Sequence, residues 1–115
     1  MQERRKIPRN HLVHYLRLFD QETKAVLGNM IDISMSGIRM ISEGAIPPGT
    51  YFKIHMDFPE EVTGKLFLTF EAVCVWCKPE ESSNLFTAGC EFRKIADEDR
   101  EILHYLIDLY QDEEV

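Results

Sequence analysis

The sequence lacks any apolar run that approaches the ~20 residues a membrane-spanning helix needs. Its first residues, Met1 to Lys6, lead into no apolar segment of the kind that forms the core of a secretory signal peptide. It has only three cysteines, which cannot all pair with one another, and nothing else in it indicates secretion. We therefore predict a cytoplasmic protein with reduced and mostly buried thiols.

Positive charge is also scarce, because 13 Lys and Arg residues face 20 acids and give a net charge of -7. This balance disfavours a general nucleic-acid binder, including a small barrel that binds single-stranded RNA. The cations are nevertheless concentrated: residues 1–24 hold six of them and only three acids. That concentration fits a localised anion site or a merely solvated start of the chain, and charge alone does not decide between them.

Sequence motifs of catalysis and metal binding are missing as well. The chain has no glycine-rich phosphate loop and no G-x-S-x-G nucleophile elbow. Cys74 and Cys77 form a C-x-x-C, but residues three apart on a strand face opposite sides, and no second C-x-x-C exists. His11 and His14 fail as a ligand pair for the same reason. We expect neither an enzyme nor a metal site.

What the chain does contain, with 44% apolar residues, is a series of short segments of strand character followed by one helical segment. The predicted strands are His11–Phe19, Thr23–Ile33, Gly37–Ile41, Tyr51–Phe58, Lys65–Lys78 and Leu85–Phe92. Turns are expected between them, including one at Pro59–Glu61. Six antiparallel strands of this kind predict a small barrel, which leaves no sheet edge exposed.

Alternation within the strands predicts which side chains share a face. In Tyr51–Phe58 one face carries Phe52, Ile54, Met56 and Phe58. In Lys65–Lys78 one face carries Leu66, Leu68, Phe70, Ala72, Cys74 and Trp76. Gly89, in the middle of the last strand, marks a bulge or a close approach of the backbone.

The period becomes helical from Ala96, and the predicted helix spans residues 96–111. Its apolar stripe consists of Ile102, Leu103, Leu106, Ile107 and Tyr110. Three acids in the first turn, at positions 97–99, complement the helix dipole. We predict one domain over residues 1–115, in which this helix covers an open end or a flank of a barrel formed by residues 11–93.

The first motif with binding chemistry is R-x-x-x-R, formed by Arg5 and Arg9 with Pro8 between them. The proline excludes a helix, so the two guanidinium groups lie on an extended or bent arm before the first strand. Such an arm can fold over a ligand. Arginine can bind phosphate bidentately, pair with guanine O6 and N7, and stack on a base. Ordinary surface charges are the alternative interpretation.

The second motif is D-x-S-x-x-G, formed by Asp32, Ser34 and Gly37. Asp32 and Ser34 point to the same face, where the carboxylate can accept the N1–H and N2–H₂ of a guanine. Gly37 permits a left-handed turn or the close approach of a ligand. Alternatively, Asp32, Ser34 and Ser36 only hydrogen-bond their own turn. Together the two motifs match a guanine nucleotide that carries phosphates.

In their order and spacing, the two motifs resemble the signature of PilZ domains, which are bacterial receptors for cyclic di-GMP. Val73–Trp76 also resembles the family's Trp-containing strand, Gly89–Phe92 resembles its G-x-E-F strand, and the closing helix fits. The resemblance covers nearly the whole chain. It implies a mainly β fold, a PilZ-like six-stranded antiparallel β-barrel with a C-terminal α-helix.

The resemblance also implies a ligand and a site. The ligand-binding residues it implies are Arg5, Arg9, Asp32, Ser34 and Gly37, and Arg4, which precedes the motif, could share the role of Arg5. The arginines would clamp phosphates and guanine, and an extra arginine at position 4 could favour an intercalated dimer of the ligand over a monomer. Binding would order a flexible arm, residues 1–10, against the barrel and so signal to a downstream effector protein. The alternative is a protein-interaction module of the same fold that binds no nucleotide, which the intact signature disfavours.

Overall fold

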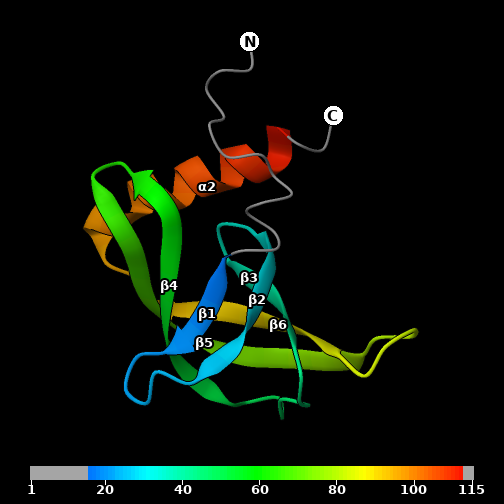
Figure 1. Ribbon diagram of the computed structural model, residues 1–115. Coiled ribbons are helices and arrows are strands. Elements are labelled where there is room, and N and C mark those ends of the chain that lie inside the picture. The colour runs from blue at the N-terminus through cyan, green and yellow to red at the C-terminus, as the bar shows by residue number, and fades with distance from the viewer. Residues whose placement is uncertain (1–15, 113–115) are drawn as a thin grey trace.

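The fold is a closed antiparallel barrel with one helix across its end, as a computed structural model describes it over residues 16–112 (Figure 1). Its strands are β1 (Arg17–Asp20), β2 (Val26–Ile33), β3 (Gly37–Ser42), β4 (Tyr51–Val62), β5 (Lys65–Pro79) and β6 (Phe86–Lys94). They pair in the order β1-β2-β3-β6-β5-β4. A 3₁₀ turn, η1 (Asp97–Asp99), leads into α2 (Arg100–Asp112). The predicted six-stranded antiparallel barrel with a C-terminal helix is confirmed.

β4 shows the predicted alternation and extends further than predicted. Ile54 and Met56 are fully buried, whereas Asp57 between the strand's inward residues is exposed. The turn expected at Pro59–Glu61 is wrong, because β4 runs on to Val62. Its pairing with β5 shifts register after Asp57, and such an irregularity accommodates a proline that has no N–H to donate.

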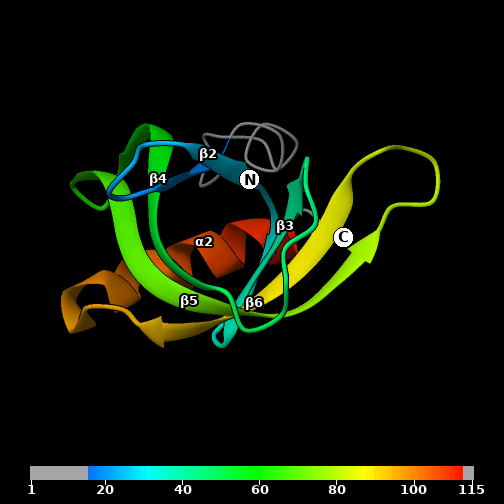
Figure 2. The same cartoon turned by 90° about the horizontal axis from the view of Figure 1, so that it is seen from below.

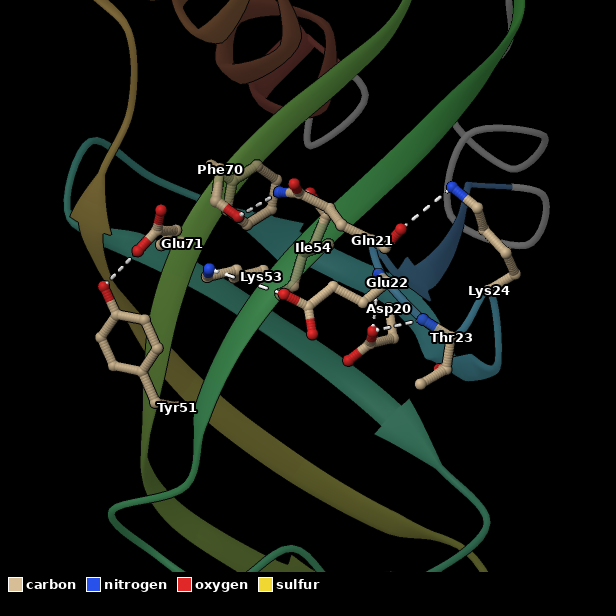
Figure 3. A network of polar contacts seen from close by, with 10 residues as sticks. All are labelled: Asp20, Gln21, Glu22, Thr23, Lys24, Tyr51, Lys53, Ile54, Phe70 and Glu71. Atoms are coloured by element: carbon tan, nitrogen blue, oxygen red, sulfur yellow. Dashed lines mark hydrogen bonds and ion pairs between the residues drawn. The ribbon is translucent and has the colours of Figure 1, made fainter.

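The turn between β1 and β2 is longer than the sequence predicts, so β2 begins at Val26 rather than Thr23. Asp20 closes this turn, since its Oδ1 accepts the N–H of Glu22 at 2.8 Å and that of Thr23 at 2.9 Å (Figure 3). These two backbone bonds, the one from Thr23 first, hold the pKa of Asp20 below its usual value. Gln21 anchors the turn to β4 by donating from Nε2 to a backbone carbonyl at 3.0 Å.

A β-bulge in β5 changes which of its side chains face the core. Cys74 pairs with Cys90 of β6, but Trp76 pairs with the adjacent Gly89, so Val75 is an extra residue on the β5 side. The alternation inverts beyond this point. The prediction that Trp76 shares a face with Cys74 is therefore wrong: Cys74 is buried in the core, and the half-buried Trp76 lies on the outer face of the barrel.

The same bulge returns Cys77 to the core side, where it packs against the buried cluster. Its Sγ accepts the backbone N–H of Ile46 at 3.4 Å, and Cys74 Sγ lies 3.8 Å from the carbonyl oxygen of the same residue. The prediction that these two thiols lie on opposite faces is thus wrong. All three cysteines are free, and the described residues contain no group of three or more His, Cys, Asp or Glu that could hold a metal.

α2 closes one end of the barrel, and Figure 2 shows it behind the ring of strands. Its buried side chains are Ile102, Leu103, Leu106, Ile107 and Leu109. The predicted stripe is therefore a packing surface; the side chain of Tyr110, the stripe's last member, lies outside those described. No described helix is long and apolar enough to cross a membrane.

An ion pair fixes the start of the helix to the barrel. Lys65 Nζ, at the beginning of β5, lies 3.0 Å from Oδ1 of the buried Asp99 in η1. The hydrogen bond to Asp99 raises the pKa of Lys65 above its usual value. The helix is thereby held to the barrel by this ion pair at its start and by its buried side chains along its length.

Candidate functional site

Asp32, Ser34 and Gly37 line one pocket of about 310 Å³ on the outer face of the barrel. The pocket begins at the turn between β2 and β3 and continues over the adjoining parts of β6 and β5. The structure thus brings together the three barrel-side residues that the sequence singles out. Arg4, Arg5 and Arg9 lie outside the described residues.

A lateral row of four paired residues forms the wall and floor of this pocket. Asp32 of β2 pairs with Arg39 of β3, Arg39 pairs with Gly89 of β6, and Gly89 pairs with Trp76 of β5. All four line the pocket. Cross-strand neighbours on one face lie close enough for their side chains to interact. The row therefore places a carboxylate, a guanidinium and an indole side by side.

Gly89 makes room for the indole at the centre of this row. A Cβ at position 89 would overlap the Trp76 ring, so the glycine allows the ring to lie against the backbone of β6. The close approach predicted for this glycine is confirmed, and the partner is a side chain of β5. Lys78 Nζ lies over the Trp76 ring, 5.4 Å from its centroid, as a cation–π contact.

The carboxylate of Asp32 is held by two donors. Its Oδ1 accepts the N–H of Ile33 at 2.9 Å, and its Oδ2 lies 3.1 Å from Arg39 Nη2. The side chains of Asp32 and Arg39 are 44% and 51% exposed, and an exposed ion pair of this kind contributes about 0.2–1 kcal/mol. Each oxygen keeps a second lone pair, so the pair can rearrange around a ligand at little cost.

The serines of the turn hydrogen-bond within it, which is the alternative that the sequence left open. Ser34 Oγ accepts the N–H of Ser36 at 3.2 Å, and the N–H of Ser34 donates to the carbonyl of Gly37 at 2.9 Å. The carbonyl of Ser36 accepts the N–H of Phe92 in β6 at 2.8 Å. These bonds fix the turn against the barrel and still leave the Ser34 hydroxyl on the pocket wall.

Of the two roles predicted for Gly37, the left-handed turn is wrong, and the close approach of a ligand stays a prediction. It is not among the described glycines with a positive φ, which are Gly49 and Gly64, so a left-handed turn is not its reason. A Cβ at position 37 would overlap the backbone carbonyl oxygen of Cys90 on β6. The glycine therefore lets β3 approach β6, and this approach brings the two walls of the pocket together.

Cys90 contributes to the pocket through its backbone and not through a reactive thiol. Burial, and then the neighbouring Cys74, raises the pKa of the Cys90 thiol to about 12. Thiolate is the nucleophilic form, so this thiol is unreactive near neutral pH.

Sequence reasoning missed two residues of the row, Arg39 and Trp76. Arg39 had a usable signal, since it stands between the apolar Ile38 and Met40 and so must point outward on the strand that follows the D-x-S-x-x-G motif. Trp76 belongs to the segment that resembles the family's Trp-containing strand, but alternation predicts an inward side chain, and its outward direction depends on the bulge in β5.

Replacing Gly37 by alanine tests the close approach of β3 and β6. We expect Gly37→Ala to lower the free energy of unfolding by about 1–3 kcal/mol, because the added methyl must displace backbone. Gly44→Ala is the matched control, since a Cβ there would meet nothing within 4 Å, and it should change stability by no more than about 0.5 kcal/mol. Urea unfolding of both variants measures the difference; equal stabilities would contradict this role for Gly37.

Comparison with known proteins places the chain in a family and a fold. A sequence model of the PilZ domain matches residues 3–109. The inhibitor of motility MotI (DgrA) of Bacillus subtilis is structurally similar, with a TM-score of 0.68 and 21% identity over 87% of this chain. The match covers 48% of that structure, so this chain spans about half its length.

A second structure, the PilZ domain of YcgR from Escherichia coli with c-di-GMP, is similar with a TM-score of 0.64 and 15% identity. The match covers 89% of this chain and 86% of that one. No curated protein matches the chain. At identities this low, the structural similarity shows a shared barrel fold alone.

Proposed function

We propose that this chain, which belongs to the PilZ domain family, is a receptor for cyclic di-GMP with no catalytic role of its own. The observation that carries the proposal is that Asp32, Ser34 and Gly37 line one pocket beside Arg39 and Trp76. The similar domain of YcgR is described with c-di-GMP. The pocket offers the hydrogen-bonding groups and the aromatic surface that a guanine base requires.

The Asp32–Arg39 pair is complementary to the Watson–Crick edge of guanine. That edge presents the O6 acceptor beside two donors, N1–H and N2–H₂. A carboxylate accepts from the donors, and an adjacent guanidinium donates to O6. Adenine presents a donor in place of O6 and lacks the N2 amino group, so the same pair discriminates against it. Trp76 supplies a surface on which a base can stack, and stacking contributes about 1–3 kcal/mol per base.

The N-terminal arginines complete the site in this proposal. Arg5 and Arg9, with Arg4 beside them, match the family's R-x-x-x-R motif and would bind the phosphates and the outer face of guanine. Ligand binding would then hold residues 1–10 against the barrel. The altered surface would be presented to an effector protein, so the chain acts as an adaptor.

A titration of cyclic di-GMP into the native chain and two matched variants tests this function. Asp32→Ala should weaken binding about 10- to 100-fold, because a charged acceptor of two hydrogen bonds is lost. Asp57→Ala removes a more exposed carboxylate, 63% against 44% for Asp32, from the outer face of β4 and should bind as the native chain does. Arg5→Ala should weaken binding similarly to Asp32→Ala.

Isothermal calorimetry provides the measurement and also the ligand stoichiometry, which distinguishes a monomer from an intercalated dimer. If the native chain gives no saturable heat with cyclic di-GMP, the receptor function is wrong and the chain is an interaction module that binds no nucleotide. Binding that Asp32→Ala leaves intact would mean that the ligand lies elsewhere.

Arg39→Ala tests the discrimination between bases. We expect it to bind cyclic di-GMP more weakly and, more tellingly, to reduce the preference for cyclic di-GMP over cyclic di-AMP by about tenfold, because the donor to O6 is removed. Competition of the two nucleotides for the native and variant proteins gives this ratio directly. An unchanged ratio would show that Arg39 does not read the base.

A further inference from the structure

A second concave surface adjoins the guanine pocket and differs from it in charge. It has a volume of about 460 Å³ and shares Ser36 and Glu91 with the first pocket. Its cations are Arg93 and Lys94, at the end of β6, and Arg100, at the start of α2. We name these three residues, together with Met35 and Ile95, which also line this surface, the basic groove.

The concentration of cations in this groove is unusual for the chain. Beyond residue 24 the sequence has seven Lys and Arg residues against seventeen acids, and three of those seven lie in the basic groove. They reach it from two elements, β6 and α2. In a strongly acidic body, such a local excess of positive charge attracts anions and raises their concentration nearby.

The cations of the groove are held only by exposed partners. Arg93 Nη1 lies 2.9 Å from Glu91 Oε1, and these side chains are 47% and 53% exposed. Arg100 Nε lies 3.2 Å from Asp97 Oδ1, and the Asp97 side chain is 99% exposed. Lys94 forms no ion pair with a described residue. Surface pairs of this kind are weak, so an arriving anion can replace the carboxylates.

The guanine pocket by itself is poorly suited to phosphate. Its described charged residues are Asp32, Arg39 and Glu91, and the one cation among them is already paired with Asp32. A phosphodiester placed beside the base would therefore meet more negative than positive charge within that pocket. Beside that pocket, the single Lys78 lies over the Trp76 ring, whereas the basic groove, which shares Ser36 and Glu91 with the pocket, offers three cations.

We propose that the basic groove binds the phosphodiester of the nucleotide whose guanine occupies the adjacent pocket. Lys94 and Arg100 contact the phosphate oxygens. Arg93 gives up its ion pair with Glu91 and binds the phosphate instead. Met35, which is 49% exposed, and Ile95 provide an apolar edge for the ribose. The inference rests on the proposed function and adds to it an anion subsite on the barrel itself, separate from the N-terminal arm.

The double variant Lys94→Gln/Arg100→Gln tests this subsite. Its matched control is Lys24→Gln/Lys53→Gln, which removes the same two charges from exposed positions at the β1–β2 turn and on β4. We expect the groove variant to bind cyclic di-GMP about tenfold more weakly, because two charge-assisted contacts are lost. The control should bind as the native chain does. Thermal unfolding should show both variants folded, since every substituted side chain is exposed.

Two further readouts separate a phosphate contact from other causes. Guanosine, which carries the base without phosphate, should bind both double variants and the native chain equally. The slope of log Kd against log salt for cyclic di-GMP should be shallower in the groove variant, since fewer cations neutralise the ligand. This salt dependence can be measured even if guanosine alone does not bind.

The possible failures are distinguishable. No binding of cyclic di-GMP to the native chain overturns the proposed function, and the groove subsite falls with it. Native binding that Lys94→Gln/Arg100→Gln leaves unchanged in affinity and salt dependence overturns the subsite alone. Equal weakening by the control variant would show a general effect of net charge and would also overturn it.

Discussion

The β-bulge in β5 is the constraint on which the outer pocket depends. Without the extra residue at Val75, strict alternation would turn Trp76 into the core beside Cys74 and direct Cys77 outward. With it, the indole lies on the outer face, against Gly89, at the end of the row that begins with Asp32 and Arg39. One inserted residue therefore decides whether an aromatic surface faces the core or a ligand.

The closed barrel makes this half of the site rigid. Asp32 and Arg39 sit on paired strands, and the turn between those strands is fixed by its own hydrogen bonds and by the bond from Phe92 to Ser36. Gly37 allows β3 to approach β6 closely enough to form the opposite wall. In the proposed function, such a preformed half lowers the entropy cost of binding.

Much of the fold could be predicted from the sequence, because the segments between turns alternate in polarity and the final segment has helical period. The strand ends were predicted less well. Pro59 predicts the end of a strand, but a register shift accommodates it, and Asp20 extends a turn through hydrogen bonds that no polarity pattern reveals.

The site was predicted in part. Its motif residues Asp32 and Ser34 could be read directly, because their types and spacing carry the chemistry. Arg39 could have been found from its outward position opposite Asp32. Trp76 and the basic groove could not, since one depends on a bulge and the other on residues from β6 and α2 that only the folded chain brings beside Ser36. The role proposed for Arg4, Arg5 and Arg9 rests on the sequence alone.

The most direct measurement of the central claim uses the single tryptophan of the chain. Because Trp76 lines the proposed guanine pocket, its fluorescence should change saturably as cyclic di-GMP is added, at the concentrations where calorimetry records binding. A base stacked on an indole changes the polarity around the ring and the decay of its excited state, and both changes alter the fluorescence. Calorimetric binding without any change in tryptophan fluorescence would contradict the account, because it would place the ligand away from this pocket.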